Sequence, residues 1–521
     1  TYRAMMKYPI GIQSFPDIRE RGFVYVDKTA FVYQMALMGK YYFLSRPRRF
    51  GKSLLVSTME AYFLGRKELF KGLAMEKLET EWKTYPVLHL DLNAQNYVDE
   101  NALHEELDKH LVIWEQTYGI AIDKSLSPET RFYNVIRNIY QQTGSQVVVL
   151  VDEYDKPLLS TIDNETLHTS YRNTLKAFFS VLKSLDACIR FAFITGVSKF
   201  SHVSIFSDLN NLNDVSMDAH YADICGISEQ ELHAYFDNSI HELADANGMT
   251  YEETCEQLRR QYDGYHFLQN SVGIYNPFSL LNTFAKGAFN DYWFATGTPT
   301  FLVKLLQQND YELSELQEIY VSASTLTSTN EDYDDPIPVL YQSGYLTIKG
   351  RDPYMGLRLG FPNEEVERGF FDFLLPYYAS RRKSSVDGFL NKMTAAIAKG
   401  CPDELLQVIQ TMLAGRSYMV AGADKEKDFQ NTLYLIFIML GYNVQVEQAT
   451  SQGRMDITIQ TKDYIYIIEL KLDKTAEEAL QQIKDNNYPR PFLSDNRKLY
   501  LIGVNFSSET RTVEKWVIEE R

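Results

Sequence analysis

The sequence of 521 residues lacks the features of a secreted, membrane-spanning or zinc-binding protein. Its four cysteines are far apart and show no C-x-x-C spacing, which predicts reduced thiols without a zinc site. The longest apolar runs, such as Leu433–Leu440, are much shorter than the roughly 18 residues that span a bilayer, and the N-terminus has no signal-peptide core. We therefore expect a cytoplasmic protein with no membrane contact.

Positive charge is also in short supply, with 52 lysines and arginines against 69 acidic residues and a formal net charge of −17. This balance argues against a protein that coats nucleic acid regardless of sequence, although it leaves room for a local basic groove. The composition is otherwise that of an ordinary globular protein. The length suggests about three to four domains.

The segment SRPRRFGKSLL has the end of a phosphate-binding loop but not its beginning. Gly51, Lys52 and Ser53 match the G-K-[ST] end of the pattern, whereas Arg46 stands where the first glycine is expected. An apolar strand pattern precedes the loop and helical apolar spacing follows it, which is the context that holds phosphates at a helix N-terminus. We predict that Lys52 contacts the β- and γ-phosphates of ATP and that the Ser53 hydroxyl binds Mg²⁺.

The loop carries three arginines, Arg46, Arg48 and Arg49, which we expect to add positive charge beside the phosphates. Two alternatives stay open for Arg46 and Arg48. They contact the γ-phosphate of their own chain, or they reach a neighbouring subunit of a homo-oligomer.

Two more apolar runs end in polar residues that belong at such a site. The run QVVVLV is uninterrupted, as in a strand buried on both faces of a parallel sheet, and it ends at Asp152 and Glu153. Carboxyl ends of parallel strands line the crevice where α/β sheets bind ligands, so Asp152 is expected in the Mg²⁺ shell and Glu153 beside the attacking water. The run RFAFIT places Thr195 or Ser198 where it can sense the γ-phosphate.

The segment GRMDITIQTKDYIYIIELKLDK predicts a metal site on a β-hairpin. If the chain turns at Lys462 and Asp463, Asp456 and Glu469 face each other with Cβ atoms about 5 Å apart, close enough to bind one divalent cation. Lys471 lies two residues beyond Glu469 and so on the same face, where its ammonium group can orient water or stabilise a charged transition state.

Taken together, several segments resemble the prokaryotic AAA-ATPase-like family that carries a PD-(D/E)XK nuclease domain at its C-terminus. The matching segments include PIGIQSFPDIRERGFVYVDKT, SRPRRFGKSLL, VDEYDKPLL, ITGVSKFSHVSIFSDLNNLNDVSM, QYDGYHF, YNPFSLL and YWFATGTPTFL. The resemblance implies that the arginine-rich loop is the usual form in this family. It also implies that Tyr25, Asp27 and Lys28 lie near the base or ribose of the nucleotide.

The same resemblance extends the nuclease site beyond the hairpin. It implies that Glu426 assists metal binding, that Asp456 and Glu469 are metal ligands, and that Lys471 is catalytic. Gln482 is expected to support the geometry or to contact the phosphate. Gly453 and Arg454 also match the family, with Arg454 a candidate phosphate contact.

The expected fold class is α/β, with a P-loop NTPase core on a parallel sheet, a helical lid, a winged-helix module and a C-terminal restriction-endonuclease-like α/β domain. The expected boundaries are residues 1–225 for the ATPase domain, 226–315 for the lid, 316–378 for the winged-helix-like module, 379–424 for a helical connector and 425–521 for the nuclease-like domain. Because the winged-helix segment is not basic, packing is favoured over DNA contact. The turn TGTP, at 296–299, resembles the turn before the lid of STAND-type ATPases.

Two hypotheses of function follow. The first is an ATP-binding and ATP-hydrolysing protein that regulates cleavage of nucleic acid by its C-terminal domain, with Mg²⁺ as the metal and Mn²⁺ as an alternative at the nuclease site. The second is a nucleotide-dependent switch or scaffold whose nuclease-like domain binds nucleic acid or a partner without cutting. Retention of Asp456, Glu469 and Lys471 favours the first, and the acidity of the chain favours the second.

Overall fold

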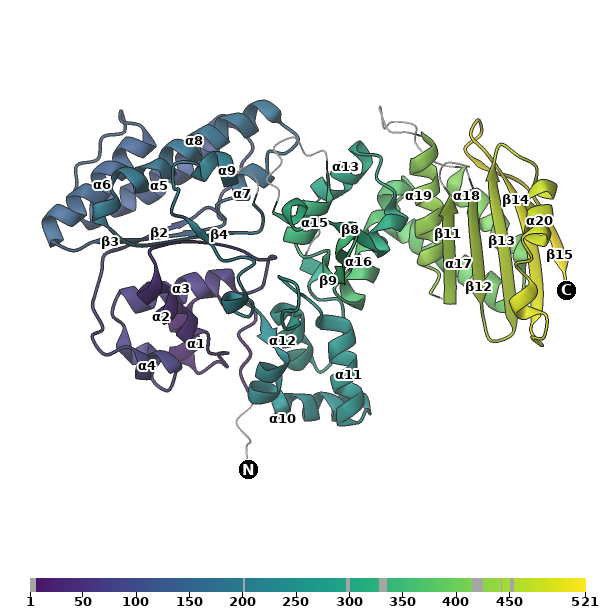
Figure 1. Ribbon diagram of the computed structural model, residues 1–521, viewed down its shortest axis with the longest axis horizontal. Helices are drawn as coiled ribbons and strands as arrows, with labels where there is room; N and C mark the ends of the chain where they lie inside the picture. Colours follow the sequence, from purple (N-terminus) through teal and green to yellow (C-terminus); the bar gives the residue numbers. More distant parts are fainter. Residues whose placement is uncertain are drawn as a thin grey trace. The chain divides into compact units, whose positions relative to one another are not determined.

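The computed structural model describes residues 6–199, 202–296, 300–327, 335–414, 425–441, 443–449 and 454–521. Its contacts divide the chain into two compact units (Figure 1). The first unit comprises Thr1–Gly297 and Ile319–Glu365, and the second comprises Thr298–Glu318 and Val366–Arg521. None of the described helices is both long and apolar enough to cross a bilayer. The expected five-part division stays a prediction.

The first unit is built on a five-stranded parallel sheet in the order β2-β3-β4-β1-β5. Its strands are β1 (Tyr41–Ser45), β2 (Val87–Asp91), β3 (Val147–Asp152), β4 (Ile189–Gly196) and β5 (Asn213–Asp214). Every residue of β1 and β3 is buried, which confirms the parallel-sheet core that the apolar runs predict. Since β4 lies between β1 and β3, the carboxyl ends of these three strands meet at one edge of the sheet.

Helices cover both faces of this sheet (Figure 1). On one side lie α1 (Phe15–Arg21), α2 (Thr29–Met38), α3 (Lys52–Phe63) and α4 (Ala74–Leu78). On the other lie α5 (Glu100–Thr117), α6 (Pro128–Thr143), α7 (Lys156–Leu159), α8 (Glu165–Ser184) and α9 (His202–Phe206). Short 3-10 turns occur at η1 (Lys67–Phe70), η2 (Asp186–Cys188) and η3 (Ala219–Tyr221). Phe132 of α6 stacks on Phe178 of α8 in the resulting core, with ring centroids 4.2 Å apart.

A helical segment follows the sheet, as the sequence predicts. It contains β6 (Ile227–Ser228), α10 (Glu229–Asn247), α11 (Tyr251–Tyr262), β7 (Ile274–Tyr275), α12 (Pro277–Lys286) and η4 (Phe294–Thr296). Ser228 and Glu231 form a capping box at the start of α10, in which each side chain accepts a hydrogen bond from the backbone N–H of the other residue. Residues 297–299 of the expected lid turn lie outside the described residues.

The first unit ends with short helices and a three-stranded antiparallel sheet in the order β8-β10-β9. These elements are β8 (Ile319–Val321), α14 (Ala323–Leu326), α15 (Ile337–Gln342), β9 (Thr347–Asp352) and β10 (Gly356–Gly360). Tyr341 donates to the Phe267 carbonyl at 3.0 Å, and Gln342 accepts from the Lys199 backbone at 2.7 Å. The segment therefore packs on the helical segment through Phe267 and on the ATPase core through Lys199, and the choice between packing and DNA contact stays a prediction.

A buried tryptophan connects the phosphate-loop segment to a buried carboxyl group. The Trp293 indole donates to the Arg48 carbonyl at 3.1 Å, and its backbone N–H donates to Oε1 of Glu365 at 2.8 Å. Ser279 donates to the same oxygen at 2.9 Å. Burial raises the pKa of Glu365 to about 8, so this carboxyl group is mostly protonated at neutral pH.

The second unit contains a five-stranded sheet in the order β11-β12-β13-β14-β15, antiparallel except where β13 pairs with β14. Its strands are β11 (Asn443–Ala449), β12 (Arg454–Gln460), β13 (Tyr464–Leu472), β14 (Lys498–Ser507) and β15 (Thr512–Glu520). Its helices are α13 (Thr300–Gln308), α16 (Glu364–Tyr378, which begins in the first unit), α17 (Lys383–Lys399), α18 (Pro402–Leu413), α19 (Lys425–Ile438) and α20 (Ala476–Asp485), with 3-10 turns η5 (Leu313–Gln317) and η7 (Arg490–Phe492).

Alternating side chains of β13 hold helices on both faces of this sheet. Ile465 and Ile467 pack with Ile483 of α20 on one face. Tyr466, between them, points the other way and donates to the Ile397 carbonyl of α17 at 2.7 Å. This period of two is the reason that a hairpin register can be read from sequence.

The close approach of the α15–β9 turn to the phosphate loop predicts a stability effect at Gly344. This glycine has a φ of +88°, and a Cβ there would lie 2.6 Å from Cγ of Pro47. We expect Gly344→Ala to lower the free energy of unfolding by about 3 kcal/mol, because it adds a clash with a rigid ring to the backbone strain. Chemical denaturation of the full chain measures the change.

The control for this substitution is Gly22→Ala. Gly22 has a φ of +69°, but a Cβ there meets no described atom within 4 Å. Only strain is added, so we expect a loss of about 1 kcal/mol. Equal losses at Gly344 and Gly22 would show that the contact with Pro47 is too loose to matter.

The protonated Glu365 predicts a pH dependence of stability. Its folded-state pKa of about 8 lies above the ordinary value of 4.5, so the folded chain binds the extra proton and loses stability as the pH rises between these values. Glu365→Gln keeps the acceptor oxygen without the charge, so its melting temperature should exceed that of the wild type by a margin that grows from pH 5 to pH 9. The exposed neighbour Glu364, changed to Gln, serves as the control. A margin that stays constant with pH would contradict the assignment.

Candidate functional site

The phosphate-binding loop folds closely around Lys52. Gly51 has a φ of +95° and caps α3, which begins at Lys52. The Lys52 ammonium group is buried, donates to the Pro47 carbonyl at 3.1 Å and lies 3.7 Å from Oε1 of Glu153. The lysine therefore stands between the loop and the end of β3, as the loop pattern predicts.

Arg46 does not take the position expected for a phosphate contact. Its guanidinium group is buried, donates to the carbonyls of Ser45, Ser216 and Tyr221, and lies 4.0 Å from the ring centroid of Phe267. A buried guanidinium group needs acceptors for its N–H groups, and these carbonyls supply them for Nη1 and Nη2, whereas Nε has no partner among the described residues. Arg46 thus braces the start of the loop, and its expected contact with the phosphates is corrected to a structural role.

Arg48 and Arg49 lie against aromatic rings of the helical segment. The Arg48 guanidinium group is 5.2 Å from the ring centroid of Trp293, and that of Arg49 is 4.4 Å from the centroid of Phe278. Arg49 is exposed and has a φ of +62°. Both side chains keep positive charge beside the loop, and their contact with phosphates or with a neighbouring subunit stays a prediction.

The end of β3 provides the acidic group expected at the magnesium shell. Asp152 is buried, and its Oδ1 has no hydrogen-bond partner among the described residues. Burial, followed by the charge of Glu153, raises the pKa of Asp152 to about 6, whereas a hydrogen bond with Ser53 lowers it. An unpartnered carboxylate oxygen beside a serine hydroxyl fits a hard divalent cation.

Glu153 follows directly and occupies a strained backbone position. Its φ is +56°, which is uncommon for a residue with a side chain. The turn brings the carboxylate toward Lys52 instead of continuing the strand. The backbone at this point therefore orients the residue expected beside the attacking water.

The Thr195 hydroxyl group is engaged with the neighbouring strand. It is buried and donates to the Leu44 carbonyl of β1 at 2.7 Å. The side chain thus ties β4 to β1, and the expectation that Thr195 or Ser198 senses the γ-phosphate stays a prediction. The physical reason is the pairing of neighbouring parallel strands, which offers the hydroxyl group a carbonyl acceptor.

Asp155, which the sequence reasoning missed, anchors the segment after β4. Its buried carboxylate accepts hydrogen bonds from the Val197 N–H at 3.2 Å, the Ser198 N–H at 2.6 Å and the Ser198 hydroxyl at 2.7 Å. Gly196 makes room for it, since a Cβ there would lie 2.4 Å from Oδ1. The second aspartate of the VDEYD motif was the signal available in the sequence.

The residues expected at the base or ribose have different surroundings. Asp27 accepts from the Thr29 N–H and hydroxyl and from the Ala74 N–H, so its carboxylate connects the starts of α2 and α4, and its expected nearness to the base or ribose stays a prediction. Lys28 pairs with Glu231 at 2.6 Å. A mainly apolar pocket beside Gly51 is lined by residues that include Val24, Tyr25, Val26, Lys28, Leu54, Ile227 and Phe236.

The hairpin of the second unit has the predicted register. Asp456 pairs with Glu469 and Arg454 pairs with Lys471 across β12 and β13. Glu469 is fully buried, and neither of its carboxylate oxygens has a hydrogen-bond partner within the described chain. Burial, followed by the charge of Asp456, raises the pKa of Glu469 to about 7. Lys471 lies 3.8 Å from Oε1 of Glu469.

Asp456 is paired by two side chains. Arg454 donates to both of its carboxylate oxygens, with Nε at 3.1 and 2.9 Å. The Tyr488 hydroxyl donates to Oδ2 at 3.1 Å. Sequence reasoning missed Tyr488, and no local pattern marks it, because it reaches the hairpin only through the fold of the segment after α20.

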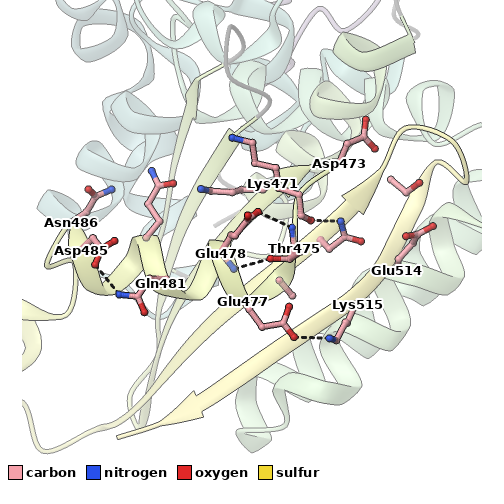
Figure 2. Close-up of a pocket in the computed structure, with 15 residues that line it drawn as sticks. Lys471, Asp473, Thr475, Glu477, Glu478, Gln481, Asp485, Asn486, Glu514 and Lys515 are labelled. Atoms are coloured by element: carbon pink, nitrogen blue, oxygen red, sulfur yellow. Dashed lines mark hydrogen bonds and ion pairs between the residues drawn. The ribbon is translucent and has the colours of Figure 1, made fainter.

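Lys471 and Gln482 line one pocket of about 1090 Å³ beside α20. Figure 2 shows Lys471 with Glu478 and Gln481 of that helix and with the ion pair between Glu477 and Lys515. Gln482 is thus brought to the same site as Lys471, as expected. The pocket mixes both signs of charge, so it is not a purely basic groove.

The remaining expected ligand is not described. Glu426 belongs to α19, but its side chain lies outside the described residues, as does Gly453. Within the described ranges, no group of three or more His, Cys, Asp or Glu side chains is arranged as a metal site. The buried oxygens of Glu469, opposite Asp456, nevertheless fit a divalent cation, which needs anionic oxygen ligands.

Two family profiles match the chain. The profile described as a predicted AAA-ATPase matches residues 9–206. The profile of the PD-(D/E)XK nuclease superfamily matches residues 424–516. The first range contains the phosphate loop and the ends of β3 and β4, and the second contains the Asp456–Glu469 hairpin.

Individual proteins are also similar. An uncharacterized protein in the vnfD 5′ region of Azotobacter chroococcum mcd 1 is 36% identical, over 98% of this chain and 99% of that protein. The ORC2 protein of Aeropyrum pernix (ADPNP–ADP complexes) is 12% identical over 64% of this chain and 88% of its own, with a TM-score of 0.27. The ORC1 protein of Aeropyrum pernix in complex with DNA is 11% identical over 66% and 90%, with a TM-score of 0.24.

The profiles match the two parts of the chain that carry the sites, and the Azotobacter relative matches it over nearly its whole length. The chain therefore belongs to the family of predicted AAA-ATPases that carry a PD-(D/E)XK nuclease superfamily domain at the C-terminal end.

Proposed function

We propose that this protein binds and hydrolyses ATP and thereby regulates metal-dependent cleavage of nucleic acid by its C-terminal domain. The observation that carries the proposal is the buried Glu469 carboxyl group, which has no hydrogen-bond partner among the described residues and is placed opposite Asp456 and beside Lys471. A buried carboxyl group without a hydrogen bond, opposite a second carboxylate, is costly unless it serves a ligand.

At the nucleotide site, Lys52 is oriented to neutralise phosphate charge. It is already desolvated by the loop, so little reorganisation is needed when phosphates arrive. Ser53 and Asp152 hold the magnesium ion, Glu153 accepts a proton from the attacking water, and the apolar pocket beside Gly51 receives the base. Asp155 fixes the segment after β4 at the rim of this site.

At the nuclease site, Asp456 and Glu469 hold the cation, Mg²⁺ or Mn²⁺. When bound, the metal supplies charge neutralisation and a more acidic water molecule. Lys471 holds a positive charge where negative charge develops on the phosphodiester, and Gln482 contacts the substrate from the same pocket. The partner is therefore a nucleic acid with its phosphate backbone against β13 and α20.

Regulation of the nuclease by ATP, the five-domain division, the winged-helix identity of the β8–β10 segment and a homo-oligomer completed by Arg48 belong to the same proposal. The switch or scaffold without cleavage is the alternative, and the experiments below separate the two.

The nucleotide site is tested by two substitutions. Lys52→Ala should weaken ATP binding by about 100-fold, because it removes a charge-assisted contact to the phosphates. Glu153→Gln should leave binding nearly unchanged and slow hydrolysis by about 100-fold, since it removes the proton acceptor. Fluorescent-nucleotide titration and phosphate release measure the two effects. Equal ATP affinity in wild type and Lys52→Ala would refute the assignment.

The nuclease site is tested by separating metal binding from cleavage. Asp456→Asn and Glu469→Gln should each weaken Mg²⁺ binding by about tenfold or more, since each removes a ligand charge. Lys471→Ala should retain the metal and lose about 100-fold in cleavage rate. Calorimetry and a nuclease assay with and without ATP give the two readouts.

Lys515→Ala is the matched control, because Lys515 lines the same pocket but pairs with Glu477 at 2.5 Å. Its cleavage rate should equal that of the wild type. A folded protein that binds divalent cations but cleaves neither DNA nor RNA under any of these conditions favours the scaffold.

A further inference from the structure

Arg454 places its guanidinium group against both carboxylates of the nuclease site. It is the first residue of β12, and its Nε lies 3.1 and 2.9 Å from the two carboxylate oxygens of Asp456. The same atom lies 3.7 Å from Oε1 of Glu469. Nη2 contacts Asp456 and the Tyr488 hydroxyl. A side-chain cation therefore bridges the two groups that would hold a divalent cation.

The cluster already contains two cationic side chains. Arg454 lies beside both carboxyl groups, and Lys471 lies 3.8 Å from Glu469. A divalent cation added to the intact cluster would meet two positive side chains at short range. Of these, Arg454 is the one whose donors occupy the oxygens of Asp456.

The two carboxylates differ in what they offer a metal. Both oxygens of Glu469 have no hydrogen-bond partner in the described parts of the chain. Those of Asp456 accept from Arg454 and from Tyr488. Glu469 can therefore bind a metal directly, whereas Asp456 can do so only after Arg454 leaves it.

A phosphodiester offers Arg454 a replacement for Asp456. The planar guanidinium group matches two phosphate oxygens as well as it matches a carboxylate. The Arg454 side chain is 19% exposed and that of Asp456 is 17% exposed, against 1% for Glu469, so both members of the Arg454–Asp456 ion pair reach solvent. A phosphodiester that reaches the hairpin replaces one anionic partner of the guanidinium group with another, so the charge of Arg454 stays paired.

We infer that Arg454 is a displaceable counter-ion that keeps Asp456 from the metal in the free protein and transfers to a phosphodiester of the nucleic acid, which frees Asp456 for the cation. Nucleic acid and divalent cation then bind cooperatively, and by linkage each tightens the other by the same factor. The inference rests on the proposed nuclease function and adds an order of events to it. Metal is retained only where substrate is present.

Calorimetry with Ca²⁺ on the full chain tests the inference, with no nucleic acid, with a short DNA duplex and with a short RNA strand. A heat of Ca²⁺ binding that the wild type shows and Glu469→Gln lacks identifies binding at this site. In the wild type, whichever of the two nucleic acids binds, DNA or RNA, should tighten Ca²⁺ binding by about tenfold. Arg454→Gln should bind Ca²⁺ about tenfold more tightly without nucleic acid and show no further gain when it is added.

The matched control is Lys471→Gln, which removes the same charge but, among the described residues, forms its ion pair with Glu469 and not with Asp456. A purely general charge effect would tighten Ca²⁺ binding equally in Arg454→Gln and Lys471→Gln, and that result would overturn the inference. So would unchanged or weaker Ca²⁺ binding in a folded Arg454→Gln. If that variant does not fold, Arg454→Lys is the substitute, because it keeps the charge without the planar guanidinium group. It should bind Ca²⁺ as weakly as the wild type but lose most of the coupling between Ca²⁺ and nucleic acid. Full coupling in Arg454→Lys would overturn the inference.

The inference and the proposed function fail in different ways. A wild type that couples Ca²⁺ to nucleic acid but never cleaves with Mg²⁺ or Mn²⁺ supports the counter-ion and overturns the nuclease. A wild type that cleaves, together with an Arg454→Gln variant of unaltered Ca²⁺ affinity, overturns the counter-ion alone. Coupling with DNA or with RNA supports the inference and identifies the nucleic acid.

Discussion

The side-by-side pairing of β1, β4 and β3 is the constraint on which the nucleotide site depends. These strands are parallel and almost entirely buried, so their backbone groups must pair with one another and their carboxyl ends must reach the same edge. As a result, Lys52 after β1 and Glu153 after β3 come within 3.7 Å, although a whole strand lies between their parent strands. The charged groups at this edge are largely buried, and burial strengthens the interactions among them.

In the second unit, strand pairing again sets the site, with the help of one small residue. Glu469 lies on β13, which is antiparallel to β12 on one side and parallel to β14 on the other, and it pairs with Gly503. A Cβ on Gly503 would lie 2.1 Å from the Ala476 carbonyl, so α20 packs directly on the backbone of β14. The burial of Glu469 and the nearness of Gln482 to Lys471 follow from this close packing.

Sequence was sufficient where a short-range rule applied. The register of Asp456 and Glu469 follows from the period of two and from one turn. The direction of a side chain at a crowded strand end was not predictable in this way. Thr195 turns to the Leu44 carbonyl, which is 151 positions away in the chain.

The same limit explains the residues that were misassigned or missed. Arg46 has the charge of a phosphate ligand, and only the distant carbonyls of Ser216 and Tyr221 reveal its structural role. Tyr488 meets Asp456 across 32 positions of chain. Contacts of this kind are made by the tertiary fold, and composition or spacing carries no trace of them.

The division of the chain into two units has a consequence for its synthesis. Thr298–Glu318 belongs to the second unit, but Ile319–Glu365, which follows it, returns to the first. The first unit therefore lacks β8, β9 and β10 until residues that belong to the second have already left the ribosome. Domains usually fold in turn as they emerge. Here the synthesis of the two units is interleaved. A chain that ends at Gly297 would contain the ATPase sheet without the α15–β9 turn that packs against its phosphate loop.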